Sequence, residues 1–152
     1  MTQISTCLWF HAHAEDAVAL YCHLFPGARI TGQTSGPAGP SGPPLVINFD
    51  LLGQSYAAMN GGDYYTLSPA ASIMAVVDGQ AEVDRLWSAL LEGGGMESRC
   101  GWLVDRYGLS WQIIPDGMLD LLKGDKTGKA WRAMMGMIKL DLEVIRRSSG
   151  NG

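Results

Sequence analysis

The sequence predicts an α+β protein with two tandem βαβββ modules, which form a curled mixed sheet around a cleft, and a helical C-terminal appendix. The first observation is an internal repeat at an offset of 66 positions, which preserves side-chain size and apolar character. A repeat of this length that occurs only twice indicates two fused half-modules. The second observation is that strand-like patterns give way to helical spacing in both copies. The aligned pairs include Thr6 with Ser72, Phe10 with Val76, Tyr21 with Trp87 and Gly27 with Gly93.

The first module reads as a strand at 4–10, a helix at 14–25 and a second strand at about 28–34. Pro26 and Gly27 stop the helix and turn the chain. Residues 36–44, GPAGPSGPP, predict a mobile loop that covers the cleft, because prolines lack ladder donors and glycines cost backbone entropy. Strands at 45–51 and 55–60 follow, with a hairpin turn at Gly53-Gln54.

The second module begins with a strand at about 71–77, and Asp78 is a candidate N-cap for a helix that runs to about Glu92. Three glycines at 93–95 end this helix, and three short strands follow at 96–100, 102–106 and 110–115. Residues 117–147 show helical periodicity. Their apolar stripe consists of Trp131, Met134, Met135 and Ile138.

Length and composition predict one domain with its own core, since the chain has 152 residues of which 47% are hydrophobic. We expect a single domain over 1–152, with module one at about 1–66, module two at about 67–116 and the appendix at about 117–152. A net charge of −4 without a basic stripe argues against nucleic-acid binding. No apolar run is long enough to span a membrane and three cysteines do not form a disulfide framework, so we expect a soluble, cytoplasmic protein.

Four stretches carry a family resemblance: CLWF at 7–10, AVALYCHLFPGARI at 17–30, MNGG at 59–62 and CGWLVDRYGLSWQIIP at 100–115. They resemble the PhnB-like branch of the vicinal oxygen chelate superfamily, which includes glyoxalase, bleomycin-resistance and dioxygenase proteins. This branch carries the label demethylubiquinone methyltransferase. The chain lacks the Gly-rich turn and the length of a doubly wound methyltransferase, so we do not expect methyl transfer. The resemblance also implies a homodimer, with the Met-rich C-terminal helix as a candidate contact.

In metal-dependent relatives, four ligands come from the first and last strands of the two modules. The resemblance places these positions at Thr6, Asn60, Ser72 and Gln112. All four are neutral, whereas transition metals favour imidazole, thiolate or carboxylate ligands. We therefore expect neither a metal nor another cofactor.

Two hydroxyls and two carboxamides in an apolar cup would orient a small polar or aromatic ligand, or they would bond each other and fill the space of a lost metal. Both alternatives stay open. Period-2 alternation puts further residues on the same faces. The predicted ligand-binding cleft comprises Thr6, Leu8, Phe10, Tyr56, Asn60, Ser72, Met74, Ser110 and Gln112.

We expect a metal-free protein that binds an unidentified small molecule in an apolar cleft. The alternative is an enzyme of the glyoxalase or dioxygenase type, although no catalytic residue is identified. A third possibility is a dimeric interaction module whose own side chains fill the cleft. Other candidates are a metal pair at His11 and His13, a nucleophile at Cys100, and an aromatic lid at Tyr64 and Tyr65. For each of these a structural role is the simpler interpretation, and for Asp105 we expect hydrogen bonds to a turn.

Overall fold

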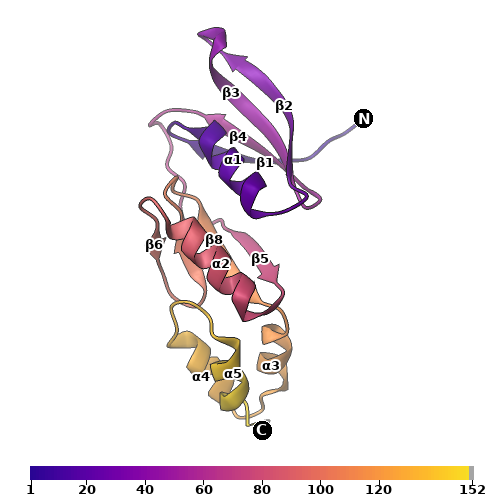
Figure 1. Cartoon of the computed structure of the whole chain (residues 1–152), viewed down its shortest axis with the longest axis vertical. Helices are drawn as coiled ribbons and strands as arrows, with labels where there is room; N and C mark the ends of the chain where they lie inside the picture. Colours follow the sequence, from indigo (N-terminus) through magenta and orange to yellow (C-terminus); the bar gives the residue numbers. More distant parts are fainter. Residues whose placement is uncertain (151–152) are drawn as a thin grey trace. The chain divides into compact units, whose positions relative to one another are not determined.

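The computed structural model describes residues 1–150 and divides into two units, unit 1 (Met1–Leu67) and unit 2 (Ser68–Gly152). Each unit carries one four-stranded sheet with one long helix across it (Figure 1). The predicted α+β class, the two βαβββ modules and the C-terminal helices are confirmed.

Unit 1 contains a mixed sheet in the order β1-β4-β3-β2. Strand β1 is parallel to β4, and the remaining neighbours are antiparallel. The elements are β1 Thr6–Phe10, α1 Ala14–Leu24, β2 Arg29–Gly36, β3 Gly39–Leu51 and β4 Gln54–Asn60.

Unit 2 repeats this topology in the order β5-β8-β7-β6, with β5 parallel to β8. The elements are β5 Ile73–Val77, α2 Gly79–Leu91, β6 Met96–Glu97, β7 Trp102–Val104 and β8 Ser110–Pro115. The prediction of one curled sheet is wrong, because the first strand of each module pairs with the last strand of the same module. The ladders therefore form two separate sheets that are not curled.

The Pro-rich stretch 36–44 does not form the predicted loop. It forms the end of β2 and the start of β3, where Ser35 pairs with Pro44 and Gly36 with Gly39 through two register shifts. Strand β3 pairs with β4 only from Val46 onward, so the preceding proline-containing part has a partner on one side only. Proline is tolerated there because an edge position does not need every ladder donor.

In unit 1 the core lies between α1 and one face of the sheet. The Tyr21 ring of α1 lies 6.3 Å from the Phe49 ring, which stacks on Tyr56 at 5.2 Å. Buried apolar side chains from α1 and from three strands surround this contact. They include Ala14, Ala17, Val18, Leu24, Leu8, Phe10, Ile47, Leu51 and Ala58.

In unit 2 the core has the same layout. The indole N–H of Trp87 on α2 donates to the Glu97 carboxylate on β6 at 2.9 Å. Glu97 pairs with Leu103, and Leu103 pairs with Trp111, so these side chains share the face under α2. Leu103 and Trp111 are fully buried there.

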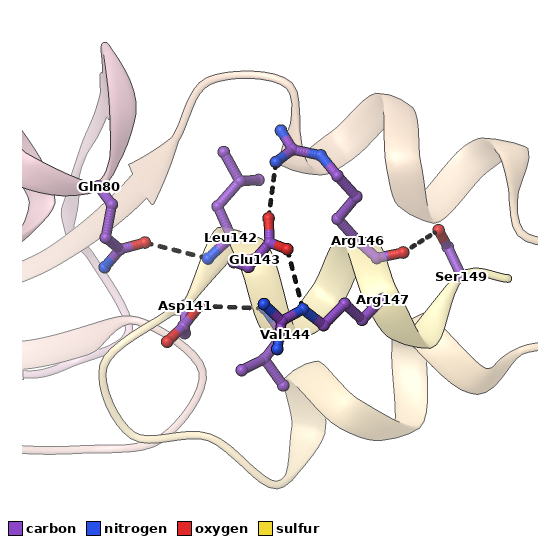
Figure 2. Close-up of polar contacts among 8 residues, drawn as sticks. All are labelled: Gln80, Asp141, Leu142, Glu143, Val144, Arg146, Arg147 and Ser149. Atoms are coloured by element: carbon purple, nitrogen blue, oxygen red, sulfur yellow. Dashed lines mark hydrogen bonds and ion pairs between the residues drawn. The ribbon is translucent and has the colours of Figure 1, made fainter. Parts of the chain in front are cut away.

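The C-terminal appendix forms three short helices, α3 Met118–Gly124, α4 Lys129–Met135 and α5 Leu142–Ser148. Gln80 at the start of α2 binds the beginning of α5 and the residues before it: its carboxamide oxygen accepts from the Leu142 amide at 3.0 Å, and its nitrogen donates to the Leu140 carbonyl at 2.9 Å. Figure 2 shows the first of these contacts.

Helix α5 is reinforced by its own polar side chains (Figure 2). The Asp141 carboxylate accepts from the Val144 amide as an N-cap. Arg147 and Arg146 donate to Glu143 and lower the pKa of its carboxyl group.

The predicted apolar stripe of the appendix is only partly buried. Met134 joins a buried cluster with Ile114, whereas Trp131, Met135 and Ile138 are about half exposed. The homodimer contact expected at this segment stays a prediction. Among residues 1–150, no helix combines the length and the apolar character needed to cross a membrane.

A buried carboxylate organises the turn between β7 and β8. Asp105, which is 3% exposed, accepts hydrogen bonds from the amides of Tyr107 and Leu109 through Oδ1. Its Oδ2 accepts from the indole N–H of Trp111 at 2.9 Å. Asp105 therefore fixes both the turn and the largest buried side chain of this sheet, which confirms the turn role expected for it.

Replacing Asp105 with alanine is expected to lower the free energy of unfolding by about 3 kcal/mol, because the amides of Tyr107 and Leu109 and the indole of Trp111 all lose their carboxylate acceptor. Chemical denaturation of the whole chain measures this. Arg106→Ala is the matched control, since Arg106 is exposed beside the same turn, and it should cost less than about 1 kcal/mol. Equal losses in the two variants would show that the carboxylate does not hold the turn.

Candidate functional site

The helix-free face of the unit 2 sheet carries four of the nine predicted cleft residues. Met74 pairs with Gln112 across β5 and β8, and Ser110 lies two positions before Gln112 on the same face. Ser72 immediately precedes β5 and receives a hydrogen bond of 2.9 Å from the Gln112 carboxamide. The structure thus brings Ser72, Met74, Ser110 and Gln112 onto one surface, opposite α2.

The Ser72–Gln112 pair is half-buried and keeps unused hydrogen-bonding capacity. Gln112 donates one side-chain N–H to the Ser72 hydroxyl. The carbonyl oxygen of Gln112 can still accept a hydrogen bond from a ligand, and the Ser72 hydroxyl hydrogen can still be donated to one. Apolar side chains flank the pair: Met74 and Val76 are each 54% exposed. Trp102 pairs with Gln112 from the other side.

Ser110 adds a second hydroxyl on this face. The residue is 1% exposed, and its Oγ is the one buried side-chain oxygen or nitrogen without a hydrogen-bond partner in the part of the chain that the structure describes. Buried polar groups normally have a hydrogen-bond partner, so the Ser110 hydroxyl lacks a bond that its burial would ordinarily require.

The other five predicted cleft residues lie on the face that α1 covers. Leu8 and Phe10 are 6% and 1% exposed and belong to the core of unit 1. Tyr56 stacks on Phe49 beneath α1, and burial raises the pKa of its phenol. Thr6 is the first residue of β1 and pairs with Tyr56. It lies on the same face of the sheet, and its side chain is exposed.

Asn60 has a structural role on that face. Its carboxamide oxygen accepts from the Ala14 amide at 2.9 Å, which caps α1 where the local N-cap residue His13 offers no side-chain bond. Its nitrogen donates to the Glu15 carboxylate at 2.8 Å and to the Pro44 carbonyl at 2.9 Å. The functional groups of Asn60 are therefore used in holding α1, β4 and β3 together.

The two sets of predicted cleft residues lie on different faces because the core-facing helix residue comes 11 positions after the strand end in unit 1 (Phe10 to Tyr21) and 10 positions after it in unit 2 (Val77 to Trp87). After β1 the Gly61 amide donates to the Phe10 carbonyl, and after β5 the Asp116 amide donates to the Val77 carbonyl. Phe10 is thus equivalent to Val77, and the strands align at an offset of 67 residues. The helices keep the offset of 66 residues, since Tyr21 and Trp87 both face the core.

A shift of one residue moves every side chain of a strand to the opposite face. The helix-free face of unit 1 therefore carries positions that sequence reasoning missed. Aligning the repeat at the strand ends, with one extra residue allowed between β1 and Tyr21, would have found them. They are Ser5, Cys7, Trp9, Ala57 and Met59.

The four positions expected for metal ligands do not fit a divalent metal. All are neutral, Asn60 is occupied as the cap of α1, and Thr6 and Asn60 lie under α1 whereas Ser72 and Gln112 lie opposite α2. Among residues 1–150, no three His, Cys, Asp or Glu side chains come together as a metal site. His11 contacts Asp63 and Thr66, and His13 contacts Asp16, at exposed positions.

Cys100 and the tyrosines have local contacts. The Cys100 thiol lies 3.8 Å from the Met135 sulfur, and its amide donates to the Met137 carbonyl. The Tyr65 ring lies 5.0 Å from the Trp9 ring and 4.7 Å from the Tyr64 ring.

Comparison with known proteins gives a family and a fold. The family model described as 3-demethylubiquinone-9 3-methyltransferase matches residues 2–114. The chain is similar to a PhnB protein from Bacillus cereus, described as a 3-demethylubiquinone-9 3-methyltransferase, with 26% identity, a TM-score of 0.66 and coverage of 75% of this chain and 99% of that one. No curated protein sequence matches significantly.

Two further solved structures support the fold alone. A protein from Pseudomonas aeruginosa is 21% identical with a TM-score of 0.60, and the match covers 76% of this chain and 100% of that one. The fosfomycin resistance protein FosX from Listeria monocytogenes is 12% identical with a TM-score of 0.54, and the match covers 79% of this chain and 97% of that one.

The structural role of Asn60, which makes three hydrogen bonds, is testable by comparison with Gln112, which makes one. Asn60→Ala should lower the free energy of unfolding by about 2 kcal/mol, because it removes the cap and two further hydrogen bonds. Gln112→Ala should cost less than about 1 kcal/mol, because it removes one half-buried hydrogen bond. Thermal or chemical unfolding of both variants provides the comparison.

The Asn60→Asp variant distinguishes a helix-capping role of this position from a metal-ligand role. The carboxylate still accepts from the Ala14 amide but faces Glu15 and has no hydrogen to donate, so the variant should be less stable than the wild type. Adding zinc or manganese should not restore stability. Metal-dependent stabilisation of the wild type or of this variant would contradict the assignment.

Proposed function

This chain belongs to the 3-demethylubiquinone-9 3-methyltransferase family, and we propose that it is a small-molecule binding protein whose ligand contacts the helix-free face of the unit 2 sheet. The observation that carries the proposal is the Ser72–Gln112 pair, a hydrogen-bonded hydroxyl and carboxamide set among exposed apolar side chains. Thr6, Leu8, Phe10, Tyr56 and Asn60 are left out because they lie on the face under α1.

The chemistry of this face suits an uncharged polar group attached to an apolar body. Gln112 supplies an acceptor and Ser72 a donor, side by side, which matches a ligand that carries a hydroxyl next to a carbonyl. Met74 and Val76 supply apolar contact beside them. Ligand-binding sites typically combine a small number of oriented polar groups with a mainly apolar lining.

The same face argues for binding over acid–base catalysis. Every described strand position opposite α2 is apolar or neutral: Met74, Val76, Met96, Trp102, Val104, Ser110, Gln112 and Ile114. Of these, Ile114 is buried against the C-terminal appendix and does not face a ligand. General acid–base catalysis needs a titratable side chain within reach of the substrate. The alternative of a glyoxalase-like or dioxygenase-like enzyme would need a group from another part of the protein.

The family description names a demethylated ubiquinone, so a water-soluble hydroxyl-bearing benzoquinone is the first probe. We expect it to bind and to shift the side-chain amide NMR resonance of Gln112. Gln112→Ala should weaken binding about three- to tenfold, the value of one hydrogen bond. Gln33→Ala is the matched control, because it removes an exposed carboxamide from β2, and its affinity should equal that of the wild type.

Mass spectrometry of the probe after incubation with a methyl donor distinguishes binding from catalysis. An unchanged mass is expected. A methylated product would favour the enzyme interpretation. If the quinone and a panel of cyclic hydroxyketones all fail to perturb β5 and β8, the proposed site is wrong.

A further inference from the structure

Unit 1 carries an aromatic cluster on its helix-free side, formed by Trp9, Tyr64 and Tyr65. The Trp9 and Tyr65 rings lie 5.0 Å apart at 80°, and the Tyr65 and Tyr64 rings lie 4.7 Å apart at 85°. Tyr64 is 81% exposed and Tyr65 is 58% exposed. Large rings are normally buried for their apolar area, so three touching rings at the surface form a patch available for contact.

The segment 61–66 is fixed in place and does not simply trail from the sheet. The Trp9 indole N–H donates to the Gly62 carbonyl at 2.9 Å, and the amides of Gly61 and Gly62 donate to the carbonyls of Phe10 and His11. Gly61 lies flush against the indole, since a Cβ there would come within 2.2 Å of the ring. The Thr66 hydroxyl lies 3.1 Å from the His11 imidazole. The rings are therefore held by both ends of the segment.

The same segment carries a negative charge. Asp63 lies between Gly62 and Tyr64, and its side chain is 93% exposed. The Asp63 carboxylate lies 3.5 Å from the His11 imidazole, a long contact for an ion pair. Aromatic faces carry negative electrostatic potential, and a neighbouring carboxylate adds to it.

From these contacts we infer that Trp9, Tyr64 and Tyr65, together with Asp63, form a binding site for a small organic cation, of the quaternary or alkylated ammonium class. Each edge-to-face contact covers a face of one ring only, and the exposure of Tyr64 and Tyr65 leaves further ring surface for a cation. Several aromatic faces around one cation is how proteins recognise quaternary ammonium groups. A flat uncharged ligand would gain nothing from Asp63. The site belongs to unit 1 and does not depend on the function proposed for the unit 2 face.

Titration of the full chain with choline tests the inference, with the Trp9 indole N–H NMR resonance as the readout. The control ligand is the neutral isostere in which carbon replaces the ammonium nitrogen. We expect saturable binding of choline and at least threefold weaker binding of the isostere. Equal affinity for the two ligands, or no response to choline, overturns the inference.

Variants identify the groups responsible. Tyr64→Leu keeps an apolar side chain without a ring, and Asp63→Asn keeps the shape without the charge; each should weaken choline binding about two- to fivefold, as expected for cation–π and exposed charge contacts. Asp16→Asn is the matched control, because Asp16 forms a similar exposed contact with a histidine, His13. Unchanged choline affinity in both test variants, or an equal loss in the control, contradicts the site. Gln112→Ala should leave choline binding unchanged, which separates this site from the unit 2 face.

Discussion

The constraint on which the rest of this structure depends is that one helix covers one face of each four-stranded sheet. Because successive side chains of a strand point to opposite faces, the phase of each strand decides which residues become core and which stay available for a ligand. In unit 1, Phe10 and Asn60 lie under α1, whereas Trp9 and Met59 lie on the other side. No rearrangement of loops can move a side chain across that boundary, since a shift by one residue would bury polar groups and expose the core.

The sequence predicted the order and type of nearly all elements, because hydrophobic periodicity and Pro-Gly stops report directly on local structure. It failed at residues 36–44, where prolines were expected to exclude a strand. They are accommodated because that part of β3 has a neighbour on one side only. The hairpin turn was misplaced by one residue: it lies at Leu52-Gly53, where both residues have positive φ and Asp50 accepts from the Gly53 amide.

The sequence placed candidate cleft residues in both modules, and the structure puts the two sets on different faces of their sheets relative to the covering helix. The 66-residue offset taken from the helices placed Thr6 and Ser72 at equivalent positions. That offset does not hold for the strands, since Tyr21 comes 11 positions after the end of β1 whereas Trp87 comes 10 positions after the end of β5. Periodicity within a strand gives two faces but does not say which face the helix covers. That choice depends on a non-local contact such as that of Tyr21 with Phe49.

The most direct test of the phase of β1 is thiol labelling of the native chain, with Cys22 and Cys100 replaced by alanine. Cys7 is exposed on the helix-free face, whereas Leu8 is buried beneath α1. The rate of reaction with a water-soluble disulfide reagent is compared for Cys7 and for Leu8→Cys in a Cys7→Ala background. Our account predicts rapid labelling of Cys7 and labelling at position 8 that is slower by at least tenfold until the protein unfolds. Faster labelling at position 8 than at position 7 would contradict the assignment of the two faces and would return Thr6, Leu8 and Phe10 to the ligand-binding surface.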